Sequence, residues 1–157
     1  MLVDKINKFT AAIQASLGKG TIENIELELD NFLRFIQGYR VLVRSIKFVF
    51  IGLSRGEHAD KKESFEKHEI AYCERIDGAL NRILESINLC FHKKSIKEIS
   101  ATFKDKVLPA IYENERIINA VTPYLKRSIM SNIETGRKII KREYKLIQVL
   151  EEIEKKI

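Results

Sequence analysis

The chain has 157 residues, of which 28 are Lys or Arg and 22 are Asp or Glu, so its net charge is +6 with neutral histidines. This length suits one domain spanning residues 1–157, and 45% hydrophobic content is typical of a folded globular protein. Seven Gly and two Pro exclude collagen-like and linker-rich sequences, while 23 Ile and 18 Lys give a bias shared with AT-rich genomes and thermophilic proteomes.

The first two predicted helices are marked by apolar residues spaced three or four positions apart. Such spacing runs from Leu2 to Leu17 and ends at Gly18–Gly20. Thr21 is a good N-cap for the next helix. That helix carries ten consecutive apolar positions in heptad steps, which we call the heptad face. These positions are Ile22, Ile25, Leu29, Phe32, Ile36, Tyr39, Val43, Ile46, Phe50 and Leu53.

A third helix is predicted after a connection at residues 54–60 and extends to about His92. Residues 57–92 hold eight acidic and five basic side chains, so this helix is acidic. The pair Ser95 and Glu98 matches a capping box, which predicts that a fourth helix begins there.

Two prolines interrupt the remaining helical pattern. Pro109 must kink or interrupt the fourth helix, because it donates no hydrogen bond and its ring clashes with a preceding carbonyl. Thr122 followed by Pro123 is a start signal, which predicts a last helix from there to the chain end. In the alternative, Pro123 kinks a continuing helix and the turn lies at residues 132–136.

Together these elements predict an all-α protein. The lengths of the helices and their short connections favour an antiparallel four-helix bundle of long helices with a short extra N-terminal helix.

The two cysteines, Cys73 and Cys90, both fall on the apolar stripe of the third predicted helix. Their separation along a helix is about 25 Å, whereas a disulfide needs Cα atoms within about 7 Å. We therefore expect two free cysteines and a reducing, cytoplasmic location. The longest apolar run, residues 48–53, is far short of the roughly 20 residues that cross a bilayer, so no membrane-spanning segment is expected and a membrane is not a favoured partner.

Catalytic and metal-binding signatures are missing from the sequence. It contains no GxSxG, Walker A, HExxH or GxGxxG pattern. None of His58, His68 and His92 follows a Glu by three residues, as a ferritin-like di-iron site requires. We expect neither enzymatic activity nor a cofactor or metal.

A basic segment is one candidate functional surface. Residues 126–145 hold seven basic and two acidic side chains. Its candidate nucleic-acid or anion face would contact phosphates in a salt-dependent way, and the structural alternative is a solvated lysine-rich face. This face comprises Arg137, Lys138, Lys141, Arg142 and Lys145.

The second candidate surface lies in residues 41–53, which are apolar around more than one side of their helix. The candidate association residues are Phe48, Val49, Ile51 and Leu53. Three interpretations stand: bundle core, self-association surface, or membrane-surface contact.

The main functional hypothesis is a non-enzymatic scaffold or interaction protein. We expect it to form a homo-oligomer through the heptad face, with the extra apolar side at residues 41–53 in support, or to bind a helical protein partner. The alternative is a nucleic-acid-binding accessory protein that uses the basic face.

Overall fold

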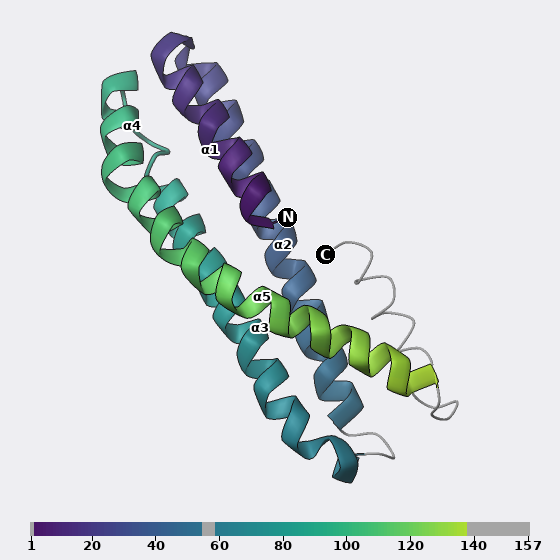
Figure 1. Cartoon of the computed structure of the whole chain (residues 1–157). Coiled ribbons are helices and arrows are strands. Elements are labelled where there is room, and N and C mark those ends of the chain that lie inside the picture. Colours follow the sequence, from purple (N-terminus) through teal and green to yellow (C-terminus); the bar gives the residue numbers. More distant parts are fainter. Residues whose placement is uncertain (1, 55–58, 138–157) are drawn as a thin grey trace. The chain divides into compact units, whose positions relative to one another are not determined.

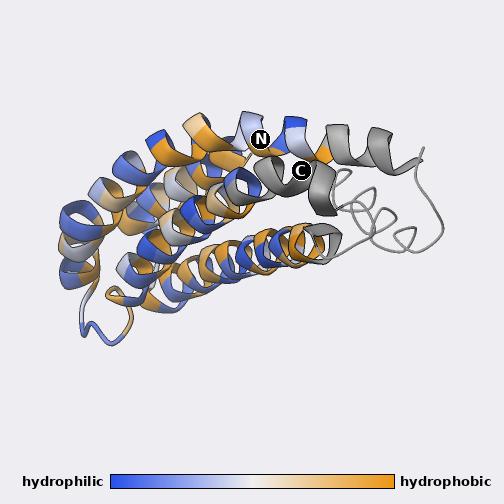
Figure 2. Ribbon diagram, turned by 90° about the horizontal axis from the view of Figure 1, so that it is seen from below, coloured by the Kyte–Doolittle hydropathy of each residue, from blue (hydrophilic) through white to orange (hydrophobic). Residues whose placement is uncertain are grey.

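The computed structural model describes residues 2–54 and 59–137, and it describes the side chains of residues 2–51 and 68–129. Within these ranges the chain forms helices and turns and contains no strand, which confirms the all-α prediction (Figure 1). The helices are α1 (Leu2–Lys19), α2 (Ile22–Ser54), α3 (Ala59–Asn88), α4 (Ile96–Thr102), the π-helical turn η1 (Phe103–Val107) and α5 (Leu108–Arg137). Hydrophobic and hydrophilic residues lie on different sides of these helices (Figure 2).

The link between α1 and α2 agrees with the sequence prediction. The Gly20 N–H donates to the Ser16 carbonyl over 2.6 Å, which satisfies one of the last carbonyls of α1. A Cβ atom at Gly20 would lie 2.9 Å from that carbonyl oxygen, so the close approach requires glycine. The Thr21 hydroxyl oxygen accepts a bond from the Asn24 N–H at 3.3 Å and caps α2 as predicted.

The heptad face lies in the protein's own interior. Ile22 and Tyr39 are partly exposed and the side chain of Leu53 lies outside the described residues. The other seven positions are at most 2% exposed. These seven are Ile25, Leu29, Phe32, Ile36, Val43, Ile46 and Phe50. These seven positions are therefore covered within the chain, and the expectation that a second chain joins through the heptad face stays a prediction.

Helix α3 ends at Asn88, four residues before the predicted end near His92. A turn follows, in which His92 has a φ angle of 72°, a left-handed conformation that cannot continue an α-helix. Cys90 therefore lies in the turn and not in the helix. Both Cys73 and Cys90 are free and buried, as expected.

Helix α4 begins with the predicted cap. The Ser95 side chain accepts a bond from the Glu98 N–H at 3.2 Å. The Glu98 carboxylate accepts from the N–H of Lys94 at 3.1 Å, so the return bond of the capping box reaches one residue further back than the usual partner.

Pro109 interrupts the α-helical pattern, as predicted, through the turn η1. The wider turn lets the Leu108 N–H donate to the Phe103 carbonyl, five residues back. Helix α5 then begins at Leu108, so Pro109 occupies the first turn, where a missing N–H costs least.

The prediction that a last helix begins at Thr122 and Pro123 is wrong. Pro123 lies inside α5, which continues to Arg137, and the alternative turn at residues 132–136 is helical as well. Val121 and Leu125 are buried on either side of the proline, at 1% and 3% exposure. Burial of both side chains on one continuous helix offsets the lost hydrogen bond.

Two compact units divide the described chain, and α2, α3 and α5 each contribute to both. Unit 1 comprises Met1–Arg40 and Gly78–Ile118, and unit 2 comprises Val41–Asp77 and Asn119–Ile157. The expectation of one domain stays a prediction.

In unit 1, aromatic stacking joins α1 to α2. The Phe9 ring stacks on Phe32 at a centroid distance of 5.3 Å and on Phe35 at 5.2 Å. Polar contacts join the next pairs of helices: Arg40 donates to Asn81 at 2.8 Å, and Arg82 donates to Asn114 at 2.8 Å.

In unit 2, Tyr72 of α3 stacks on Tyr124 of α5 at 5.9 Å. The apolar core of this unit also draws on α2, α3 and α5. Its buried members are Val43, Ile46, Val49, Phe50, Cys73, Ile76, Val121, Leu125 and Ile129.

Candidate interaction site on α2 and α3

The outward side of α2 in unit 2 exposes two large apolar side chains. Phe48 is 75% exposed and Val41 is 62% exposed. They lie seven residues apart, or two helical turns, and so share one face. Between them, the Ser45 hydroxyl donates to the Val41 carbonyl at 2.9 Å, so it is satisfied within the helix. We call Val41, Ser45 and Phe48 the outer face of α2.

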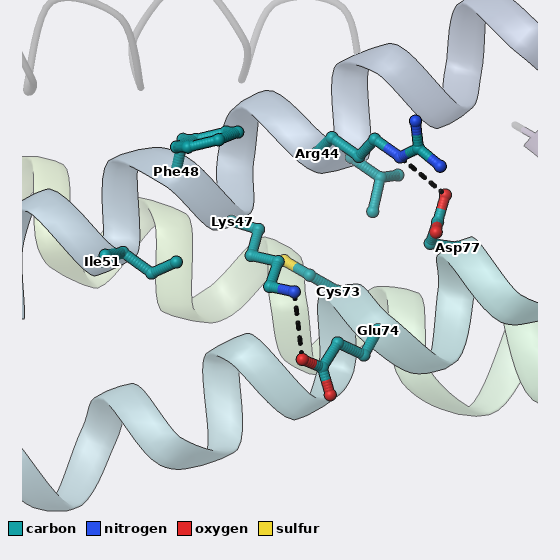
Figure 3. Close-up of a pocket in the computed structure, with 8 residues that line it drawn as sticks. Arg44, Lys47, Phe48, Ile51, Cys73, Glu74 and Asp77 are labelled. Atoms are coloured by element: carbon teal, nitrogen blue, oxygen red, sulfur yellow. Dashed lines mark ion pairs between the residues drawn. The ribbon is translucent and has the colours of Figure 1, made fainter.

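A cavity of about 370 Å³ lies beside Phe48, between α2 and α3 (Figure 3). Its floor includes Val43 and Cys73, which are 2% and 1% exposed. The full lining is Val43, Arg44, Lys47, Phe48 and Ile51 from α2, and Cys73, Glu74 and Asp77 from α3.

Ion pairs cross the mouth of this cavity from α2 to α3. Lys47 Nζ lies 3.0 Å from Glu74 Oε1, and Arg44 Nε lies 3.7 Å from Asp77 Oδ1 (Figure 3). The side chains are 24–58% exposed, and pairs of this kind contribute only about 0–1 kcal/mol to stability. They can therefore exchange partners at small cost.

The Cys73 thiol that lines the cavity is unreactive at neutral pH. Burial raises the pKa of Cys73 to about 12, and the negative charge of Glu69, one turn earlier, adds to this rise. A thiol with this pKa is protonated at neutral pH, so it acts as an apolar surface and not as a nucleophile. Among residues 2–51 and 68–129 no group of three potential ligand side chains is placed to hold a metal ion.

The predicted association residues have different environments in the structure. Phe48 is on the surface and partly exposed Ile51 lines the cavity, but Val49 belongs to the core at 4% exposure. Leu53 lies in α2, and its side chain is outside the described residues.

Sequence reasoning included Val41 in the apolar segment 41–53 but not among the candidate association residues, and it missed the α3 side of the cavity. The signal for Val41 was its seven-residue spacing from Phe48, off the heptad face. No local signal shows that Glu74 and Asp77 face Arg44 and Lys47, because the ion pairs depend on the tertiary packing of α3 against α2.

The predicted nucleic-acid face lies outside the side chains that the structure describes. Arg137 is the last residue of α5 and its side chain is not described, while Lys138, Lys141, Arg142 and Lys145 lie outside the described residues. Nucleic-acid binding by this face stays a prediction.

None of the described helices combines the length and the hydropathy needed to cross a bilayer. Comparisons with protein-family models, curated proteins and solved structures give no match for this chain.

Proposed function

We propose that this protein is a non-enzymatic helical interaction protein that associates with itself through the outer face of α2. The observation that carries this proposal is the paired exposure of Val41 and Phe48 on one helical face. Phe48 is the most exposed large apolar side chain that the structure describes. Apolar residues clustered on one face mark association surfaces more often than apolar residues scattered singly.

The burial of the heptad face supports the same choice of surface. Seven of its positions are already covered within the chain, so they are not available to a partner. The outer face lies on another side of the same helix and keeps its apolar side chains in solvent.

The helix arrangement that we propose for this protein is an antiparallel four-helix bundle. It is supported by the order of contacts in unit 2, where Arg44 pairs with Asp77 and Lys47 pairs with Glu74. Position along α2 rises while position along α3 falls, as in antiparallel neighbours. In unit 1, the short link after Lys19 and the stacking of Phe9 on Phe32 support the same relation between α1 and α2.

Sedimentation equilibrium over micromolar to millimolar concentrations tests the function. The expected result is a reversible increase in mass, which Val41→Asp shifts to higher concentration by burying a charge in the interface. Leu89→Asp is the matched control, because Leu89 is 52% exposed but lies in unit 1, in the turn after α3 and not on α2. A wild-type protein that stays monomeric throughout overturns the proposal.

A further inference from the structure

We propose that the partner is a second copy of this chain related by a two-fold axis, and that Phe48 of each copy enters the α2–α3 cavity of the other. This inference rests on the proposed self-association and specifies its geometry. In a two-fold dimer each contact occurs twice. A projecting side chain with a cavity beside it on the same surface is therefore sufficient to form both contacts.

The cavity suits an aromatic ring in size and chemistry. Its volume is about 370 Å³, whereas an apolar cavity of about 150 Å³ already holds benzene. Val43 and the protonated thiol of Cys73 supply an apolar floor. Phe48 stands at the rim of this cavity with 75% of its surface in solvent (Figure 3).

The charges around the cavity identify the partner as a second copy. The α2 edge is basic, with Arg44 and Lys47, and the α3 edge is acidic, with Glu74 and Asp77. A two-fold axis between these edges places the basic edge of one copy against the acidic edge of the other. Each copy is thus complementary to itself, and complementary potentials steer association and set register.

The same pattern disfavours a nucleic acid at this position. Phosphates that approach Arg44 and Lys47 would also meet the carboxylates of Glu74 and Asp77. The intrachain ion pairs are 3.0 and 3.7 Å long and partly exposed, so exchanging them for interchain pairs requires little reorganisation.

The first test compares dimerisation of the full-length wild type with that of Phe48→Ala and Tyr112→Ala. Tyr112 is an aromatic side chain at 60% exposure in unit 1 and serves as the matched control. A ring seated in a partner's pocket behaves as a hot spot, so Phe48→Ala should raise the dimer Kd at least about tenfold. Tyr112→Ala should leave it unchanged.

The second test uses two charge reversals, Lys47→Glu and Glu74→Lys. Each variant alone brings like charges together across the proposed interface and should dimerise more weakly than wild type. When the two are mixed, the heterodimer has opposite charges at both edges. Native mass spectrometry should then show more heterodimer than the statistical half of all dimers.

The outcomes separate the two proposals. If wild type dimerises and Val41→Asp weakens the dimer, but Phe48→Ala matches Tyr112→Ala, the cavity geometry is wrong while self-association stands. If the mixed charge variants form heterodimer as only half of all dimers, the proposed pairing of basic and acidic edges across the two-fold axis is also wrong. A monomeric wild type overturns both proposals together.

Discussion

The Arg82 Nε–H donates to the side-chain oxygen Oδ1 of Asn114 at 2.8 Å, and this bond joins α3 to α5 inside unit 1. The Asn114 amide in turn donates to the Ala110 carbonyl at 2.6 Å. Asn114 is only 1% exposed, so both of its polar ends are satisfied in a place where water cannot substitute.

Replacing Asn114 with Ala should lower the free energy of unfolding by about 1–3 kcal/mol, because it removes both bonds and leaves the guanidinium without this acceptor. Urea unfolding of Asn114→Ala, Arg82→Ala and the double variant gives a double-mutant cycle. We expect a coupling energy of about 1 kcal/mol between the two side chains. Strict additivity of the two single losses would contradict the contact.

Pro123 should limit the stability of α5. Pro123→Ala restores an N–H inside the helix and removes a ring clash, so the free energy of unfolding should rise by up to about 3 kcal/mol. The comparison is Pro109→Ala, which changes a first-turn position and should have a smaller effect. Chemical denaturation of both variants measures the difference, and an unchanged or less stable Pro123→Ala protein would refute it.

The α4 cap offers a local test. Ser95→Ala removes the acceptor of the Glu98 N–H and should cost about 1 kcal/mol in urea unfolding. Lys97→Ala is the control, because Lys97 is exposed in the same helix and its change should stay within about 0.5 kcal/mol. Equal losses in the two variants would show that the cap contributes nothing.

The Cys73 thiol should make stability fall at alkaline pH. Its pKa is about 12 in the folded chain against an ordinary value of 9.0, so the unfolded chain loses the proton first. The stabilising contribution is complete below pH 9 and is lost as pH rises toward 12. By pH 10 the loss is about 1.4 kcal/mol.

Cys73→Ala removes this titration. Its stability deficit relative to wild type should therefore shrink by about 1.4 kcal/mol between pH 8 and pH 10 in guanidinium unfolding. Ile76→Val, a change to a buried side chain on the same helix, should show a deficit that does not vary with pH. A constant Cys73→Ala deficit would mean that the thiol titrates alike in both states.

Local signals in the sequence predicted much of the fold. The caps at Thr21 and Ser95 depend on hydrogen bonds to residues three positions away, so the sequence contains all the information they need. The predicted helix start at Pro123 is wrong because the preference of proline for the first turn of a helix competes with the burial of Val121 and Leu125. That burial depends on the tertiary fold.

The candidate site was predicted only in part for the same reason. An apolar run identifies residues 48–53 as unusual, but it does not say which side chains face outward. Alternation between exposed Phe48 and buried Val49 follows from how α2 packs. The facing acidic edge at Glu74 and Asp77 belongs to another helix and has no signal near Phe48 in the sequence.

The π-helical turn η1 also explains an irregular spacing in the sequence. The buried residues Ile99, Phe103, Val107 and Ile111 are each four apart, whereas a plain α-helix alternates steps of three and four to keep one stripe inward. The hydrogen bond from the Leu108 N–H to the Phe103 carbonyl spans five residues, so this turn contains one residue more than an α-helical turn. Shortening the chain by one residue among 104–106, together with Pro109→Ala, would give steps of four, three and four. The helical segment from α4 to the start of α5 should therefore tolerate the loss of one residue in η1 without displacing its buried side chains.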